Sequence, residues 1–90
     1  MSERRTVEIV NERGLHARAS AKFVKLASTF DAEVSVSREG STVDARSIMG
    51  LMMLAAGIGS TIEISAEGAE AVQAVAALAE LVENRFDEER

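Results

Sequence analysis

A single histidine stands in a segment whose residue types suit the transfer of a phosphoryl group. Residues 11–18 read NERGLHAR and place His16, the sole histidine of the chain, two positions before Arg18. Imidazole titrates near neutrality, so its free nitrogen can accept a phosphoryl group and release it again. The guanidinium of Arg18 can bind phosphoryl oxygens, and Gly14 allows the loop a close turn or a positive φ.

The expected position of His16 supports the same chemistry. A strand-like alternation precedes the segment and a helical spacing follows it, so His16 is predicted at or just before a helix start. The first amides of a helix lack internal partners and carry the positive end of its dipole. We therefore expect Ala17 and Arg18 to bind the phosphate. The spacing alone also fits a polar loop residue beside a helix cap.

The rest of the pattern predicts the elements that hold this segment. Half-buried strands are expected at residues 6–10, 32–37, 41–45 and 61–66, and the short polar connection 38–40 suits a hairpin. Amphipathic helices are expected from Ala19 to Phe30 and from Ala71 to Val82. A shorter helix is expected from Ile48 to about Ala56, ended by the glycines at 57 and 59. The predicted order is βαββαβα.

Length and composition narrow the functional class. Ninety residues fit one domain, residues 1–90, whose charged tail 86–90 is expected to fray. The net charge of −5 and only three aromatic residues oppose nucleic-acid binding. No cysteine and no second histidine are present, so neither a metal site nor a cofactor is predicted. No apolar stretch of membrane-spanning length occurs, which predicts no membrane insertion and a cytoplasmic location.

A second segment, SIMGLMML at 47–54, combines a serine with methionines. Ser47 is expected to cap the short helix by accepting a hydrogen bond from its first turn. Met49 and Met53 fall on other faces of this helix, where flexible thioethers suit a surface that accepts several partners. A stripe at helical spacing is expected to lie mostly in the core: Ile48, Leu51, Met52 and Ala55.

The strings GLHAR at 14–18 and SIMGLM at 47–52 resemble the histidine-containing phosphocarrier family HPr of the bacterial phosphoenolpyruvate-dependent phosphotransferase system. The likeness covers nearly the whole chain. It implies an α+β fold, an open-faced two-layer sandwich with a four-stranded antiparallel sheet and three helices on one face. It also implies that enzyme I phosphorylates Nδ1 of His16, that Arg18 assists, and that an enzyme II A component receives the group. Such a protein is a monomeric carrier and not an enzyme.

The resemblance further implies roles for the second segment. The family docks its partners on the first two helices, which assigns partner binding to Ile48, Met49 and Met52. In many Gram-positive members the residue matching Ser47 is phosphorylated by a dedicated kinase, so Ser47 is a regulatory candidate wherever the genome encodes that kinase. One departure from the family is Ala19, because a proline usually follows the arginine. Alanine leaves the junction of loop and helix freer than proline would.

Two questions stay open on the sequence alone. Residues 30–34 and 86–88 are similar to members of the nitrogen-related branch, whereas residues 47–50 favour the sugar-uptake branch. A small ligand-sensing or protein-interaction module without covalent chemistry would also fit the order of elements, and it would not need His16. Formation of an acid-labile phosphate on His16 discriminates these classes.

Overall fold

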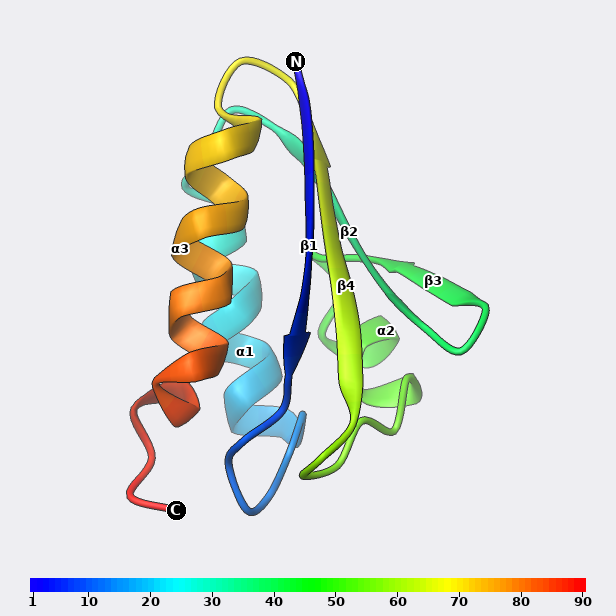
Figure 1. Cartoon of the computed structure of the whole chain (residues 1–90), viewed down its shortest axis with the longest axis vertical. Coiled ribbons are helices and arrows are strands. Elements are labelled where there is room, and N and C mark those ends of the chain that lie inside the picture. Colours follow the sequence, from blue (N-terminus) through cyan, green and yellow to red (C-terminus); the bar gives the residue numbers. More distant parts are fainter.

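The computed structural model describes residues 1–90 and has the element order βαββαβα, followed by one short 3₁₀ turn (Figure 1). None of its helices has the length and apolar character needed to cross a bilayer. The elements are β1 (Ser2–Glu8), α1 (Ala17–Ala27), β2 (Glu33–Arg38), β3 (Ser41–Asp44), α2 (Ile48–Met53), β4 (Thr61–Glu67), α3 (Ala71–Glu83) and η1 (Arg85–Asp87).

The four strands form one antiparallel sheet in the order β1-β4-β2-β3. Alternate residues of the central strand β4 are buried, and they lie opposite buried residues of both neighbours: Ile62 faces Val7 of β1, and Ile64 faces Val36 of β2. The strand period of two therefore gives the sheet one apolar face, which the helices cover, and one polar face open to solvent. This confirms the predicted open-faced α+β architecture.

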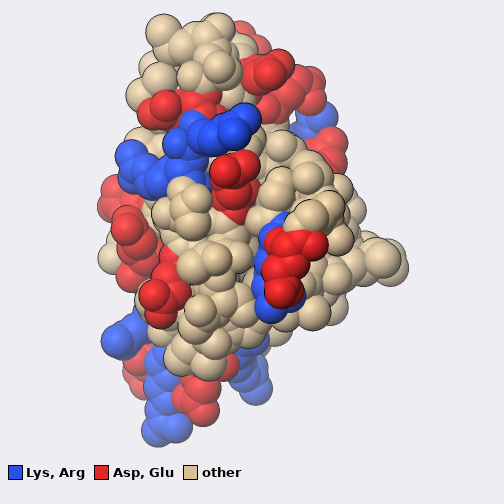
Figure 2. Space-filling view, turned by 45° about the vertical axis from the view of Figure 1, so that its right-hand side comes forward, with Lys and Arg blue, Asp and Glu red and all other residues tan.

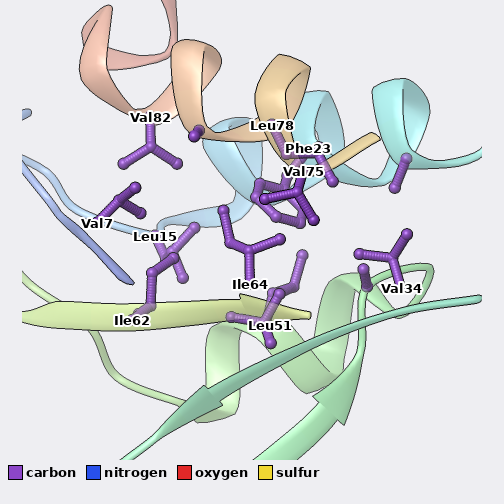
Figure 3. Packing of buried hydrophobic residues seen from close by; sticks show 14 of the residues in the cluster. Val7, Leu15, Phe23, Val34, Leu51, Ile62, Ile64, Val75, Leu78 and Val82 are labelled. Atoms are coloured by element: carbon purple, nitrogen blue, oxygen red, sulfur yellow. The ribbon is translucent and has the colours of Figure 1, made fainter. Parts of the chain in front are cut away.

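The core lies between that face and the helices (Figure 3). Phe23 of α1 and Leu78 of α3 are fully buried and point toward Ile64 of the sheet. Burying a side chain of this size stabilises a fold by roughly 1.5–3 kcal/mol relative to leaving it exposed. Leu15, in the loop that carries the histidine, belongs to the same cluster and anchors that loop to the core.

In the N-terminal half, the bounds of β1 and α1 differ from the prediction. β1 covers Ser2–Glu8 instead of residues 6–10, because it pairs with the full length of β4. Glu3 and Arg5 share the face of the buried Val7 but are charged, so the sequence shows no alternation there. α1 ends at Ala27, so Phe30 lies beyond it. The amides of Ser28 and Thr29 close the helix by donating to the carbonyls of Val24 and Leu26, respectively.

The short helix α2 ends at Met53, three residues before the predicted end. The reason is Ala55, which takes a left-handed backbone with φ of 53° and donates its amide to the carbonyl of Met52. Glycine usually fills such a position. The turn directs the chain so that the carbonyl of Ala56 accepts the amide of Leu15 at 3.0 Å. The early end of α2 thus supports the loop between β1 and α1, residues 9–16, which we call the histidine loop.

The apolar stripe predicted for the core of α2 is also wrong in most positions. Leu51 is fully buried, but Ile48 is 40% exposed and Met52 43% exposed, and Ala55 is exposed too. A six-residue helix packed on α1 and β3 has only one narrow buried side. The remaining apolar side chains face solvent. We call this the α2 surface: Ile48, Met49, Met52 and Met53.

The predicted fraying of the C-terminal tail is likewise contradicted. Phe86 is fully buried, and its carbonyl accepts a hydrogen bond from Nζ of Lys22 at 2.7 Å. The carbonyl of Arg90 accepts the amide of Glu12 at 2.9 Å. A buried aromatic and two hydrogen bonds outweigh the tendency of a charged terminus to detach. The tail therefore returns to the loop between β1 and α1 (Figure 1).

Candidate functional site

The histidine loop is built around a glycine. Gly14 has φ of +64°, and a Cβ there would lie 2.4 Å from the carbonyl oxygen of Ala56. Any larger residue would push the loop away from the segment that follows α2. The fully buried Asn11 closes the same turn, because its Nδ2 donates to the carbonyl of Gly14 at 2.9 Å. The positive φ expected at Gly14 is confirmed.

His16 is the N-cap of α1, as predicted from the pattern. Its carbonyl accepts the amide of Ser20 at 2.9 Å, but its side chain makes no capping hydrogen bond. The amides of Ala17, Arg18 and Ala19 have no backbone acceptor. No acidic residue occupies this first turn. The helix start therefore offers free donors and the positive end of the dipole, an arrangement that favours an anion.

The imidazole is held by a residue from the other end of the chain. Nε2 of His16 lies 2.5 Å from Oε2 of Glu88, and the second oxygen of Glu88 accepts a hydrogen bond from Nδ2 of Asn11 at 3.0 Å. The imidazole side chain is only 22% exposed. Glu88 was missed in the sequence, and the one signal for it was Phe86, a single aromatic in a charged tail.

The charge state of Glu88 follows from these contacts. Partial burial by itself would raise the pKa of the Glu88 carboxyl, but the hydrogen bonds from His16 and Asn11 act in the opposite direction. The positive charge of Lys22 adds a smaller contribution of the same sign. Together they hold the pKa of Glu88 below its ordinary value, so the group is a carboxylate at neutral pH.

Arg18 lies beside this pair without a partner of its own. It makes no hydrogen bond or ion pair and is exposed. It lines a shallow surface hollow of about 450 Å³ together with other charged residues: Glu12, Arg13, Lys22, Asp87, Glu88, Glu89 and Arg90. Figure 2 shows basic and acidic side chains mixed at the lower end of the molecule, where Figure 1 places the loop and the C-terminus. The guanidinium is therefore free to meet an incoming anion.

Ser47 is confirmed as the N-cap of α2, since its Oγ accepts the amide of Gly50 at 2.9 Å. The α2 surface begins directly after it and contains Met49 at 73% exposure. Because α2 packs against α1, the α2 surface and the start of α1 belong to neighbouring elements. The sequence thus identified both the cap and the methionines, although it misplaced Ile48 and Met52 in the core.

Comparisons with known proteins show which proteins this chain is similar to. A family model described as the PTS HPr component phosphorylation site matches residues 3–84. Phosphocarrier protein HPr of Cupriavidus necator is 54% identical over 84 residues, covering 93% of this chain and 94% of the relative. Phosphocarrier protein HPr of Neisseria meningitidis serogroup A is 48% identical, covering 94% and 96%.

The fold is equally similar to a solved structure. The crystal structure of HPr-C-His from Thermoanaerobacter tengcongensis superposes with a TM-score of 0.93 at 42% identity, covering 98% of this chain and 99% of that one. Family model, curated relatives and structure all span nearly the full length. The chain therefore belongs to the HPr family of the phosphotransferase system, whose members are phosphocarrier proteins and not enzymes.

Proposed function

We propose that this chain, acting as one HPr-like domain over residues 1–90 in the cytoplasm, accepts a phosphoryl group on His16 from enzyme I. It then passes the group to an enzyme II A component that serves sugar uptake or regulation. The observation that carries the proposal is the place of His16, an N-cap whose imidazole leaves three helix amides without partners. Partly buried imidazole and free donors together fit a group that is repeatedly phosphorylated.

In the loading step, the lone pair of the imidazole nitrogen attacks phosphorus while the bond from phosphorus to enzyme I breaks. The nitrogen that the family resemblance implies is Nδ1. The amides of Ala17 and Arg18 are suited to bind the phosphoryl oxygens, and the guanidinium of Arg18 adds charge-assisted donors. Unloading reverses these roles, since the electron pair of the N–P bond returns to the imidazole when the acceptor attacks.

Docking is assigned to the α2 surface, in particular to Ile48, Met49 and Met52. These apolar side chains are exposed next to α1, and thioethers adapt to partners of different shape. Ser47 borders them, so a phosphate there would introduce negative charge at the edge of an apolar contact. This supports Ser47 as a regulatory site in cells that contain a kinase for it.

The test is to incubate the full chain with phosphoenolpyruvate and enzyme I and to follow its intact mass. We expect one phosphate that requires both reagents, that brief acid removes, and that a purified enzyme II A component also removes. No uptake at any enzyme I concentration would contradict the proposal and favour the non-covalent binding module. Uptake of an acid-stable phosphate would contradict it too, since that would place the group on a hydroxyl.

A further inference from the structure

We propose that Glu88 is a positioning residue for phosphoryl transfer, which holds the proton of His16 on Nε2 and so keeps Nδ1 as the free, nucleophilic nitrogen. This inference rests on the proposed function of His16. It comes from a chain of three side chains, Asn11, Glu88 and His16, that joins the histidine loop to the C-terminal tail. The carboxylate that contacts His16 comes from 72 positions further along the chain.

The tautomer follows from donor and acceptor chemistry. An ionised carboxylate can only accept hydrogen bonds, so the contact of 2.5 Å between Nε2 and Oε2 requires a proton on Nε2. A neutral imidazole carries one N–H, and its other nitrogen then has a free lone pair. Nδ1 is that nitrogen. Glu88 therefore acts on the imidazole as the buried carboxylate of a hydrolase triad acts on its histidine, by fixing orientation and tautomer.

The carboxylate is itself held in place from two sides. Nδ2 of the fully buried Asn11 lies between two acceptors, the carbonyl of Gly14 and Oε1 of Glu88. Reversing that amide would turn its oxygen toward both acceptors, so the orientation shown is the one that chemistry permits. The buried Phe86, with its carbonyl bound by Lys22, holds the backbone two residues before Glu88.

The same contact has a role after loading. When Nδ1 carries the phosphoryl group, Nε2 keeps its proton, and the carboxylate of Glu88 compensates the positive charge that develops on the ring. In unloading, the acceptor bonds to phosphorus, the N–P electron pair returns to Nδ1, and the proton stays on Nε2 throughout. Both directions of transfer therefore leave the Glu88 contact intact. The contact stabilises the ring in the form that attacks phosphorus and in the form that releases it.

The experiment combines a spectroscopic reading with kinetics on the full chain. We would label the imidazole nitrogens with ¹⁵N and record their shifts at a pH where the ring is neutral. The wild type should show the Nε2–H tautomer. Glu88→Ala should populate the Nδ1–H tautomer and lower kcat/KM for phosphorylation by enzyme I about tenfold, the order expected for losing one charge-assisted hydrogen bond.

Two further variants separate positioning from folding and from net charge. Glu88→Gln keeps one acceptor oxygen for two donors, Nδ2 of Asn11 and Nε2–H of His16, so it should hold the Nε2–H tautomer only in part and fall between Glu88→Ala and the wild type in both readings. Glu83→Gln removes the same charge from an exposed residue at the end of α3 that makes no hydrogen bond through its side chain. It should match the wild type in both readings. Core amide shifts confirm that each variant is folded.

The outcomes separate this inference from the proposed function. An unchanged tautomer in Glu88→Ala, or a changed tautomer with a wild-type transfer rate, overturns the role of Glu88 while His16 remains the phosphorylated residue. A loss as large in Glu83→Gln as in Glu88→Ala also overturns it, because the effect would then belong to net charge. A wild type that takes up no phosphate refutes the proposed function itself, whichever tautomer is found.

Discussion

The histidine loop and the α2 surface lie on neighbouring elements. They differ in how many of their side chains have contact partners within the chain. Asn11 and Gly14 of the loop and Glu88 of the C-terminal tail hold His16 through buried and partly buried contacts. On the α2 surface, Met49 and Met53 are more than 70% exposed and contact solvent. The proposed phosphoryl acceptor is thus held by several contacts, whereas the adjoining apolar side chains are left exposed. A carrier that meets several partners with one nucleophile needs this division.

His16→Ala tests most strongly the role proposed for the histidine loop, as opposed to the α2 surface. We expect a folded protein that accepts no phosphoryl group from phosphoenolpyruvate and enzyme I, because no other side chain offers an imidazole. Intact mass before and after brief acid treatment measures the result. The partner of the lost ring, Glu88, stays hydrogen-bonded to Asn11, so the tail should remain docked. A variant that gains acid-labile phosphate as well as the wild type would place the chemistry elsewhere.

Ser47→Asp tests the α2 surface with the loop left unchanged. Aspartate caps a helix as well as serine does, so the fold should keep its stability while a negative charge appears beside exposed apolar side chains. We expect kcat/KM for phosphorylation of His16 to fall by about tenfold, which corresponds to roughly 1.4 kcal/mol of lost docking energy.

The matched control is Ser2→Asp, which adds the same charge at an exposed residue at the start of β1, the end of the molecule away from α2 in Figure 1. It should leave the kinetics unchanged. Equal slowing by both variants would mean that overall charge, and not the α2 surface, controls the encounter with enzyme I.

Local patterns in the sequence predicted what depends on neighbouring residues. The helix start at His16, the turn at Gly14 and the cap at Ser47 were all correct, because each is set within a few positions. Glu88 was missed because it lies 72 positions from His16 in the sequence. Helical and strand periodicities predict contacts only between residues close in sequence. The burial of Ile48 and Met52 was misjudged because helical spacing does not tell how much of a short helix is covered.

Ala19→Pro sharpens the description of the loop as a preorganised element. Ala19 is the third residue of α1, and its amide has no backbone acceptor, so proline would cost no hydrogen bond there. We expect the free energy of unfolding to rise by about 0.4–1 kcal/mol, because proline restricts the unfolded chain. Urea denaturation measures it. Because Ala19 is fully buried, a loss of stability would show that the core beneath α1 has no room for the ring.

The smallest expected effect concerns the pH dependence that Glu88 gives to stability. Hydrogen bonds from His16 and Asn11 outweigh desolvation and place the pKa of Glu88 in the folded protein below its ordinary value of 4.5, which the unfolded chain retains. The unfolded state therefore binds more protons between the two values. The stabilisation that ionised Glu88 contributes is complete above its ordinary pKa and is lost as the pH falls through its pKa in the folded protein. The difference in unfolding free energy between wild type and Glu88→Gln should accordingly be steady just above pH 4.5 and shrink below it.

Denaturation at a series of acidic pH values measures this difference, and a ¹³C titration of the Glu88 carboxyl measures its pKa. A difference that grows on acidification, or a carboxyl that titrates above 4.5, would show that the tail does not hold Glu88 against His16 in solution.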